Sequence, residues 1–169
     1  SSLDVGEEKA ELKMGKANIL ARIRMVILYY YANVSNYLVI GTGDKSEALI
    51  GYFTKYGDGA ADFFPIRHLY KTQVRELARY IGVPEKVAYK PSSSQLYPGH
   101  KVTDEIPLDY DKLDLILVGL FDYGMAPREV SQAASLPVQT VMEILERHSK
   151  TEHKRVSPKM VKGQVLDSP

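Results

Sequence analysis

The sequence contains no cysteine, and this absence removes several kinds of chemistry. Disulfide bridges and thiolate metal sites are excluded, and the composition fits a reducing compartment. There is also no apolar run near the ~20 residues that a membrane-spanning helix needs, and no apolar segment typical of a signal peptide. We therefore expect a soluble, cytoplasmic protein that does not enter a membrane.

A strong net charge is absent as well. The 169 residues carry 22 Lys and Arg against 21 Asp and Glu, a formal net charge of +1. No global field draws the chain to nucleic acid or an anionic membrane, so any bound anion must be held locally. With 44% hydrophobic and 25% charged residues, one globular domain over residues 1–169 is expected. The chain begins without methionine, and we expect this N-terminus to be processed or cut.

Apolar residues at spacings of three and four predict an amphipathic helix over residues 15–33. Its stripe consists of Ile19, Ile23, Val26, Ile27 and Tyr30. A second helix is predicted within 69–84, where Gly82 can end it and Pro84 prevents its continuation. Further helical patterns occupy 110–124, 126–135 and 137–149, so the C-terminal third is expected to be helical. Residues 91–108 are rich in proline and serine and predict a mobile loop.

The segment NYLVIG, residues 36–41, predicts a strand that is buried on both faces. A lone strand cannot satisfy its edges, since stable sheets usually have at least three strands. We therefore expect the other strands to come from a preceding segment or from a partner chain.

The strand is followed by a glycine-rich turn, GTGDKSE, residues 41–47. Neither the G-x-x-x-x-G-K-[ST] phosphate loop nor the G-x-G-x-x-G dinucleotide pattern is matched. Ser46 is the expected N-cap of a short helix, which places Glu47 in its first turn. Backbone N–H groups and the Thr42 hydroxyl at this sheet edge suit a phosphate ligand, and a carboxylate beside phosphates requires a cation such as Mg²⁺. Alternatively, the glycines only form a tight turn and Glu47 stabilises the helix N-terminus.

The wider sequence resembles the ammonia-dependent NAD⁺ synthetase family from about residue 15 to residue 155. The resemblance lies in GTGDKSE, in GYFTKYGDGAAD, and in the later stretches DYDKLDLIL and SKTEHKR, in this order. It implies an α/β fold with a three-layer, doubly wound parallel sheet, similar to adenine nucleotide alpha hydrolases. Residues 15–90 would form the nucleotide-binding α/β part, 91–108 the mobile loop, 109–155 the helical part and 156–169 a tail.

Two departures from the family pattern stand out. Family members begin with a strand and an S-G-G-x-D-S loop that grips the ATP pyrophosphate, and this sequence does not contain that motif. We therefore expect it to correspond to the C-terminal two-thirds of the enzyme. The family loop P-S-A-x-L-W-x-G-Q-x-D-E also differs from residues 91–105 here.

The resemblance implies that ATP adenylates deamido-NAD⁺ (nicotinate adenine dinucleotide) and that ammonia then displaces AMP to give NAD⁺. It implies ATP contacts for Thr42, Lys71 and Ser92, and a Mg²⁺ ligand in Glu47. For deamido-NAD⁺ the implied contacts are Arg22, Lys55, Asp58, Asp62, His153 and Lys154. Family members are homodimers, and the tyrosine-rich helix of residues 19–31 is the expected dimer surface. Without a cysteine, the chain offers no glutaminase nucleophile.

Two other interpretations stay open. The chain could be an inactive synthetase fragment that folds or dimerises. Residues 126–155 also have the outline of a DNA-binding helix-turn-helix with a basic end. Glu143 and Glu146 in the second helix and the near-neutral charge disfavour this nucleic-acid function.

Overall fold

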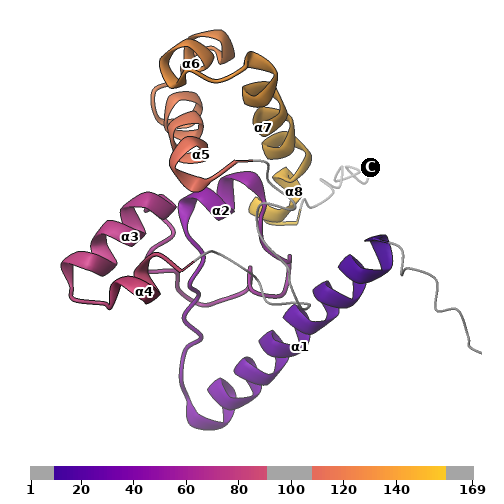
Figure 1. The fold of residues 1–169 in the computed structure, drawn as a ribbon. Coiled ribbons are helices and arrows are strands. Elements are labelled where there is room, and N and C mark those ends of the chain that lie inside the picture. The colour runs from indigo at the N-terminus through magenta and orange to yellow at the C-terminus, as the bar shows by residue number, and fades with distance from the viewer. Residues whose placement is uncertain (1–9, 91–107, 159–169) are drawn as a thin grey trace, which may run out of the picture.

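The computed structural model describes residues 10–90 and 108–158, and Figure 1 shows them as helices joined by long loops. In chain order the elements are α1 (Ala10–Ser35), α2 (Lys45–Ile50), α3 (Lys71–Tyr80), α4 (Glu85–Ala88), α5 (Tyr110–Leu117), the π-helical turn η2 (Val118–Asp122), α6 (Pro127–Ala134), α7 (Val138–Lys150) and α8 (Glu152–Arg155). Helices α5 to α7 gather at the top of the view, α3 and α4 lie on the left, and α1 runs along the lower right. The loop predicted at 91–108, except its last residue, and the tail beyond 158 lie outside the described residues.

The helices predicted from the sequence are confirmed, and their ends follow ordinary capping chemistry. Asp109 begins α5 because its side chain accepts a hydrogen bond from the backbone N–H of Lys112 at 3.0 Å. Pro127 is the first residue of α6, where its lack of an N–H costs nothing. After α3, Gly82 adopts a φ of +82°, which ends the helix as expected. The short helices α4 and α8 were not predicted.

The predicted buried strand at 36–41 is not found. Within the described ranges, Ile40 forms an isolated parallel bridge with Phe63. The backbone N–H of Gly41 donates to Phe63 O at 2.8 Å, but Leu38 is 71% exposed and Ile40 52%. A strand is buried on both faces only when neighbouring strands and covering helices flank it, and here one short segment pairs with it. The bridge is parallel, and the sheet itself stays a prediction.

The hydrophobic core lies among α2, α5, α6 and α7. Its buried members are Ile50, Tyr70, Tyr110, Leu113, Ile116, Leu117, Val130, Val141 and Ile144. In α5, Leu113, Ile116 and Leu117 share one face by their spacing of three and four residues. The last residue of α2, Ile50, is fully buried in this core. Core packing therefore fixes the C-terminal end of α2, while its N-terminal end faces a pocket.

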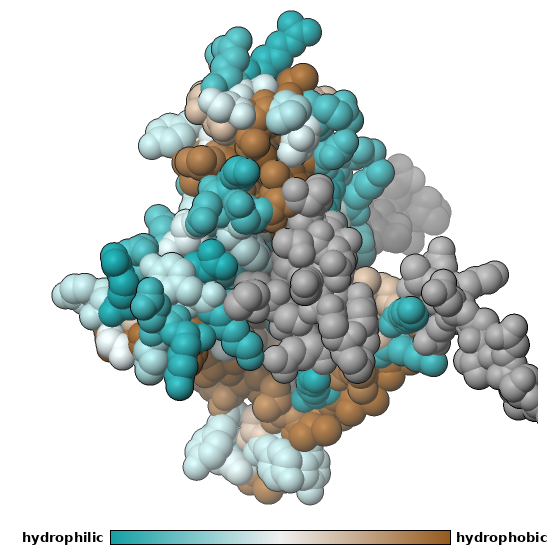
Figure 2. Space-filling model, viewed as in Figure 1, coloured by the Kyte–Doolittle hydropathy of each residue, from teal (hydrophilic) through white to brown (hydrophobic). Residues whose placement is uncertain are grey.

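Helix α1 packs through small residues and leaves its large apolar residues exposed. Ala17, Ala21 and Ala32 are buried, whereas the five residues of the predicted stripe are between 49% and 63% exposed. Figure 2 shows hydrophobic side chains on the lower right of the molecule, where α1 lies in Figure 1. None of the described helices is both long enough and apolar enough to cross a bilayer. The helix is thus confirmed, but the residues of the predicted stripe do not face this chain's core, and apolar residues such as Leu20 and Leu28 lie outside the stripe.

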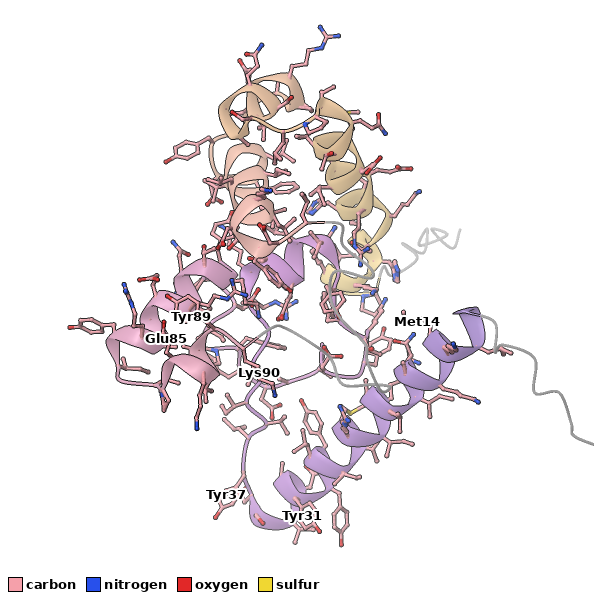
Figure 3. The ribbon with its side chains drawn as sticks, viewed as in Figure 1. Met14, Tyr31, Tyr37, Glu85, Tyr89 and Lys90 are labelled. Carbon is pink, nitrogen blue, oxygen red and sulfur yellow. The ribbon has the colours of Figure 1, made fainter. Side chains whose placement is uncertain are left out.

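Polar contacts hold α1 against the loop that follows α2. The Thr54 hydroxyl donates to Asn18 Oδ1 at 2.7 Å, and Arg22 Nε donates to the backbone oxygen of Lys55 at 3.2 Å. Near the C-terminal end of the helix, where Figure 3 labels Tyr31 and Tyr37, the Tyr29 hydroxyl donates to Asp62. These contacts place α1 along one side of the pocket.

Candidate functional site

A capping box closes the N-terminus of α2. Asp44 Oδ1 accepts from the backbone N–H of Glu47 at 2.9 Å, and Glu47 Oε2 accepts from the backbone N–H of Asp44 at 3.2 Å. The predicted N-cap, Ser46, was wrong: the cap is Asp44, and the buried Ser46 hydroxyl bonds to other helices. The D-x-x-E spacing of residues 44 to 47 is itself a capping-box pattern and could have identified the cap.

Lys71, the first residue of α3, contacts both carboxylates of this box. Its Nζ lies 2.5 Å from Asp44 Oδ2 and 2.8 Å from Glu47 Oε1. The side chains of Asp44, Lys71 and Glu47 are only 1%, 16% and 20% exposed, so little water screens these charges. We call these three residues the charge cluster.

Burial and mutual charge shift the ionisation of the cluster. Burial, followed by the negative charge of Asp44, raises the pKa of Glu47, and the Lys71 ammonium opposes both. Burial acts to lower the pKa of Lys71, but the carboxylates of Glu47 and Asp44 outweigh it, and the pKa of Lys71 is raised. Lys71 therefore keeps its proton. Its ammonium is shared by two carboxyl groups, so the cluster holds more acidic than basic side chains.

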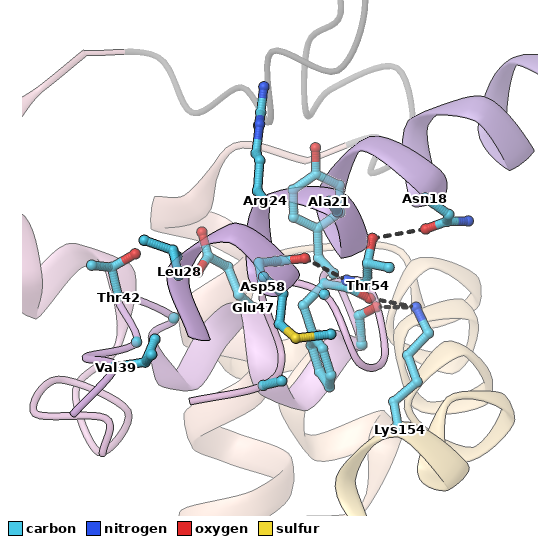
Figure 4. Close-up of a pocket in the computed structure, with 18 of the residues that line it drawn as sticks. Asn18, Ala21, Arg24, Leu28, Val39, Thr42, Glu47, Thr54, Asp58 and Lys154 are labelled. Carbon is cyan, nitrogen blue, oxygen red and sulfur yellow. Dashed lines mark hydrogen bonds between the residues drawn. The ribbon is translucent and has the colours of Figure 1, made fainter. Parts of the chain in front are cut away.

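A pocket of about 730 Å³ lies between α1, the turn before α2 and the loop after it (Figure 4). Five residues with predicted site roles line it: Thr42, Glu47, Asp58, Lys71 and Lys154. They come from five separate places in the sequence. The structure thus brings predicted ATP-contacting and dinucleotide-contacting residues to one cavity.

The other predicted residues lie elsewhere. Arg22 and Lys55 are joined by the hydrogen bond described above, outside the pocket lining. Asp62 accepts from the backbone N–H of Val39 at 2.7 Å, and so supports the parallel bridge. His153 is exposed on α8 and does not line the pocket, and Ser92 lies outside the described residues.

At the far end of α2, basic side chains bind backbone carbonyls. Lys154 Nζ donates to Gly51 O and Phe53 O, each at 2.8 Å, as the dashed lines in Figure 4 show. Arg147 Nε donates to Ile50 O at 3.1 Å, and Arg155 Nη1 donates to Leu49 O at 3.0 Å. The two arginine contacts satisfy carbonyls that the C-terminus of α2 leaves without partners within the helix. The basic C-terminal segment is therefore fastened to the pocket wall.

The pocket face of α1 was not recognised in the sequence. It consists of Met14, Asn18, Ala21, Met25 and Leu28, with Arg24 beside them. Their spacing of four, three, four and three is helical, so periodicity could have found them. The predicted stripe of Ile19 to Tyr30 is more strongly apolar and lies on another face of the helix.

The cluster suits a metal ion that is held mainly by a substrate. Among residues 10–90 and 108–158, no three acidic or histidine side chains are placed to form a metal site by themselves. Mg²⁺ in phosphate-transfer sites is often bound by one or two carboxylates, with phosphate oxygens and water as the remaining ligands. Glu47, which lines the pocket and lies beside a second acidic side chain, Asp44, fits that requirement.

Comparison with known proteins identifies consistent relatives. The NAD synthase family model matches residues 2–158. An NH(3)-dependent NAD(+) synthetase of Hyperthermus butylicus is 56% identical over 146 residues, which are 86% of this chain and 53% of that protein. A protein of the same name from Sulfolobus acidocaldarius is 46% identical over 162 residues, 95% of this chain and 58% of that protein.

Solved structures give the same picture. The NMN synthetase of Francisella tularensis is 34% identical with a TM-score of 0.74, and the match covers 89% of this chain and 58% of that one. The NH3-dependent NAD synthetase of Campylobacter jejuni is 30% identical with a TM-score of 0.67, covering 93% and 58%. The chain spans about half the length of the curated relatives it matches.

Proposed function

The chain belongs to the NAD synthase family, and from this premise we propose that it supplies much of the active site of an ammonia-dependent NAD⁺ synthetase. The observation that carries this proposal is the shared pocket, which is lined by Glu47 and Lys71 of the charge cluster and by Lys154. A ligase joining ATP to a second, anionic substrate needs two such regions within reach of each other.

The proposed reaction has two steps. The nicotinate carboxylate of deamido-NAD⁺ attacks the α-phosphorus of ATP, and the bond to pyrophosphate breaks to give an acyl adenylate. Ammonia then attacks the acyl carbon and loses a proton, and AMP leaves with the electron pair of the acyl–oxygen bond. Adenylation is required because a carboxylate is a poor electrophile until it carries a good leaving group.

The ATP side is assigned to Thr42, Lys71 and Ser92, with Glu47 as the magnesium ligand. Lys71 offers an ammonium with strong, rotatable donors to phosphate oxygens, and its raised pKa keeps it charged. Thr42 is exposed at the pocket and can donate its hydroxyl. When bound, Mg²⁺ would neutralise triphosphate charge. Glu47 would give up part of its contact with Lys71, whose ammonium then turns to the phosphates.

The deamido-NAD⁺ side is assigned to Asp58 and Lys154 on the pocket, and to Arg22, Lys55, Asp62 and His153 around it. Asp58 anchors the loop through its bond from the Thr54 N–H at 2.9 Å, and its exposed carboxylate can accept from a ribose hydroxyl. The outer residues would contact the ligand only if it extends beyond the pocket along α1.

We also propose the finer architecture expected from the sequence. The parallel bridge between Ile40 and Phe63 supports a doubly wound parallel sheet in the complete fold. The exposed apolar face of α1 supports a homodimer in which this face meets a second copy. No observation favours the helix-turn-helix alternative, since Arg147 and Arg155 at its basic end contact the carbonyls of α2.

An amidation assay tests the proposal. The chain is incubated with ATP, MgCl₂, an ammonium salt and deamido-NAD⁺, and AMP and NAD⁺ are measured; equal amounts of the two products are expected. Lys71→Met should abolish most turnover, whereas Lys112→Met, an exposed lysine on α5, should not change it. Nicotinate mononucleotide is tested in parallel, because one similar structure is an NMN synthetase. If the unmodified chain forms neither AMP nor NAD⁺, the proposal is contradicted.

A magnesium titration tests the role of Glu47. Glu47→Gln should lower kcat and shift the half-saturating Mg²⁺ concentration upward by about tenfold, because one carboxylate ligand is lost. The exposed Glu143→Gln on α7 is the matched control. A titration curve identical to that of the unmodified chain would remove the metal role.

A further inference from the structure

Asp114 is a buried carboxylate to which the proposed reaction gives no role. It lies on α5 and is 4% exposed, and Leu113, Ile116 and Leu117 of the same helix belong to the hydrophobic core. One of its oxygens accepts from the Ser46 hydroxyl at 2.5 Å, and the other accepts from the backbone N–H of Thr72 at 2.9 Å. Both oxygens therefore serve donors on other helices.

The contacts of Asp114 complete the N-terminus of α3. The N-cap of this helix, Tyr70, makes no side-chain capping bond. Instead, the backbone N–H of Lys71 donates to the buried Ser46 hydroxyl at 2.9 Å, and the next N–H donates to Asp114. Since the first N–H groups of a helix have no partner within the helix, α2 and α5 satisfy donors that α3 cannot satisfy itself.

Asp114 is linked through Ser46 and the first turn of α3 to both members of the Glu47–Lys71 ion pair. Ser46 immediately precedes Glu47 in α2, and the Ser46 hydroxyl accepts a hydrogen bond from the backbone N–H of Lys71. A shift at Asp114 would thus move the first turns of α2 and α3 relative to each other, and with them Glu47 and Lys71.

We propose that Asp114 is a positioning residue that sets the geometry between Glu47 and Lys71 through Ser46 and the first turn of α3. The part of this inference that concerns ATP rests on the proposed function. The part that concerns the two side chains stands on the hydrogen bonds alone. The two hydrogen bonds of Asp114 go to the first turns of α2 and α3, whereas Lys154 binds the backbone oxygens of Gly51 and Phe53 beyond the other end of α2.

The substitution Asp114→Asn separates positioning from simple space filling. It keeps the size of the side chain but replaces one acceptor oxygen by an NH₂ group, while both neighbours are donors. If the NH₂ group faces Thr72, two donors meet; if it faces Ser46, the buried hydroxyl loses its acceptor. In the second case the hydroxyl can still accept from the NH₂ group but has no acceptor for its own proton, so in either orientation one of the two helix contacts is lost or weakened. Asp111→Asn is the matched control, since Asp111 lies on the same helix with its side chain 78% exposed.

The first readout needs no substrate. In the chain with isotope-labelled lysine, the Lys71 ammonium resonance is assigned from its absence in Lys71→Met. Asp114→Asn should shift this resonance and speed hydrogen exchange of the Lys71 and Thr72 amides by about tenfold. Asp111→Asn should change neither. A Lys71 resonance that is the same in both Asn variants would overturn the positioning role.

The second readout separates positioning from general destabilisation. In the amidation assay, Asp114→Asn should raise KM for ATP about tenfold and leave KM for deamido-NAD⁺ unchanged. Ser46→Ala, which cuts the same link with a smaller change, should do likewise, and the double variant should be no worse than either single one. Equal rises in both KM values would overturn the inference. If the unmodified chain has no amidation activity, the proposed function fails, and the resonance decides the positioning role.

Discussion

The charge cluster places Lys71 as the shared counter-ion of two carboxylates that have little access to water. Its Nζ is within 2.8 Å of Glu47 and 2.5 Å of Asp44. In such surroundings, an ion pair adds little net stability over an apolar pair, but removal of one partner leaves a buried charge without compensation. A bound metal ion could compensate the charge of the two carboxylates in place of the Lys71 ammonium. Lys71 could then move to another ligand without leaving a buried charge uncompensated.

Removal of the ammonium should be costly. Lys71→Met keeps most of the side-chain volume but leaves Asp44 and Glu47 facing each other, so we expect the free energy of unfolding to fall by about 3 kcal/mol at neutral pH. Urea denaturation followed by circular dichroism measures it.

The matched control is Lys150→Met. Lys150 also forms an ion pair, 2.7 Å from Glu146, but the two side chains are 72% and 62% exposed. Solvent screening makes such surface pairs weak, and the expected change is below about 1 kcal/mol. Equal losses in the two variants would show that burial does not govern the cluster.

At the scale of elements, α2 is a short helix held at both ends. Asp44 caps its start, and carbonyls at its end are bound by side chains of α7 and α8. Gly51 follows it with a φ of +66°, and a Cβ at that position would overlap the side chain of Thr151. The helix and the C-terminal segment thus approach too closely for any residue but glycine.

Gly51→Ala should destabilise the chain by about 3 kcal/mol, because left-handed strain and steric overlap add together. Gly82→Ala is the control: its φ is also positive, +82°, but nothing lies within 4 Å of an added Cβ. That variant should lose only about 1 kcal/mol. Thermal unfolding of both proteins measures the difference, and equal losses would exclude a close contact between α2 and Thr151.

His148 should make the attachment of α7 to α2 depend on pH. Its Nδ1 lies 2.8 Å from Leu49 O, and its ring packs against Phe121. Burial is the main cause that lowers the pKa of His148, and the charge of Arg155 also lowers it. The Leu49 hydrogen bond and the charge of Glu152 oppose this shift. A histidine with a lowered folded pKa contributes stability above its ordinary value of 6.5, and that contribution is lost as the pH falls.

We therefore expect the stability difference between the unmodified chain and His148→Gln to shrink as the pH falls from 7.5 to about 5. Melting temperatures at several pH values provide the measurement. His68→Gln replaces an exposed histidine before α3 and serves as the control. A difference that stays constant over this range would contradict the expected protonation.

These elements also show what a sequence can predict. Helix positions followed from local periodicity and caps such as Asp109, because those depend on neighbours within four residues. The exposure of Ile23 did not follow, because an apolar stripe says nothing about which surface covers it. The role of Asp114 did not follow either, because its partners lie 68 and 42 positions away in the sequence. Lys71 was predicted only through a family resemblance, whereas Glu47 was also predicted from its place in the first turn after the glycine-rich segment.

At the scale of the whole molecule, the dominant feature is an apolar face that this chain leaves uncovered. On α1, Ile23, Val26 and Ile27 are 49%, 60% and 49% exposed, and Tyr30 and Tyr31 are each 63% exposed. Contiguous apolar surface of this kind marks an association site. We proposed above that the occupant is a second copy, whose helix would bring an identical face to the contact.

This proposal predicts concentration-dependent self-association that charge on α1 abolishes. Ile23→Glu combined with Ile27→Glu would place carboxylates in a desolvated contact, and the dimer dissociation constant should rise by at least about a hundredfold. Sedimentation velocity over a range of concentrations measures it. Leu115→Glu introduces the same charge at a residue that is 58% exposed on α5 and should leave association unchanged. If the α1 variant still dimerises with unchanged affinity, the contact lies elsewhere; if both variants dissociate, general repulsion is the cause. Dissociation of the α1 variant alone would support a dimer whose contact is formed by the exposed apolar face of α1.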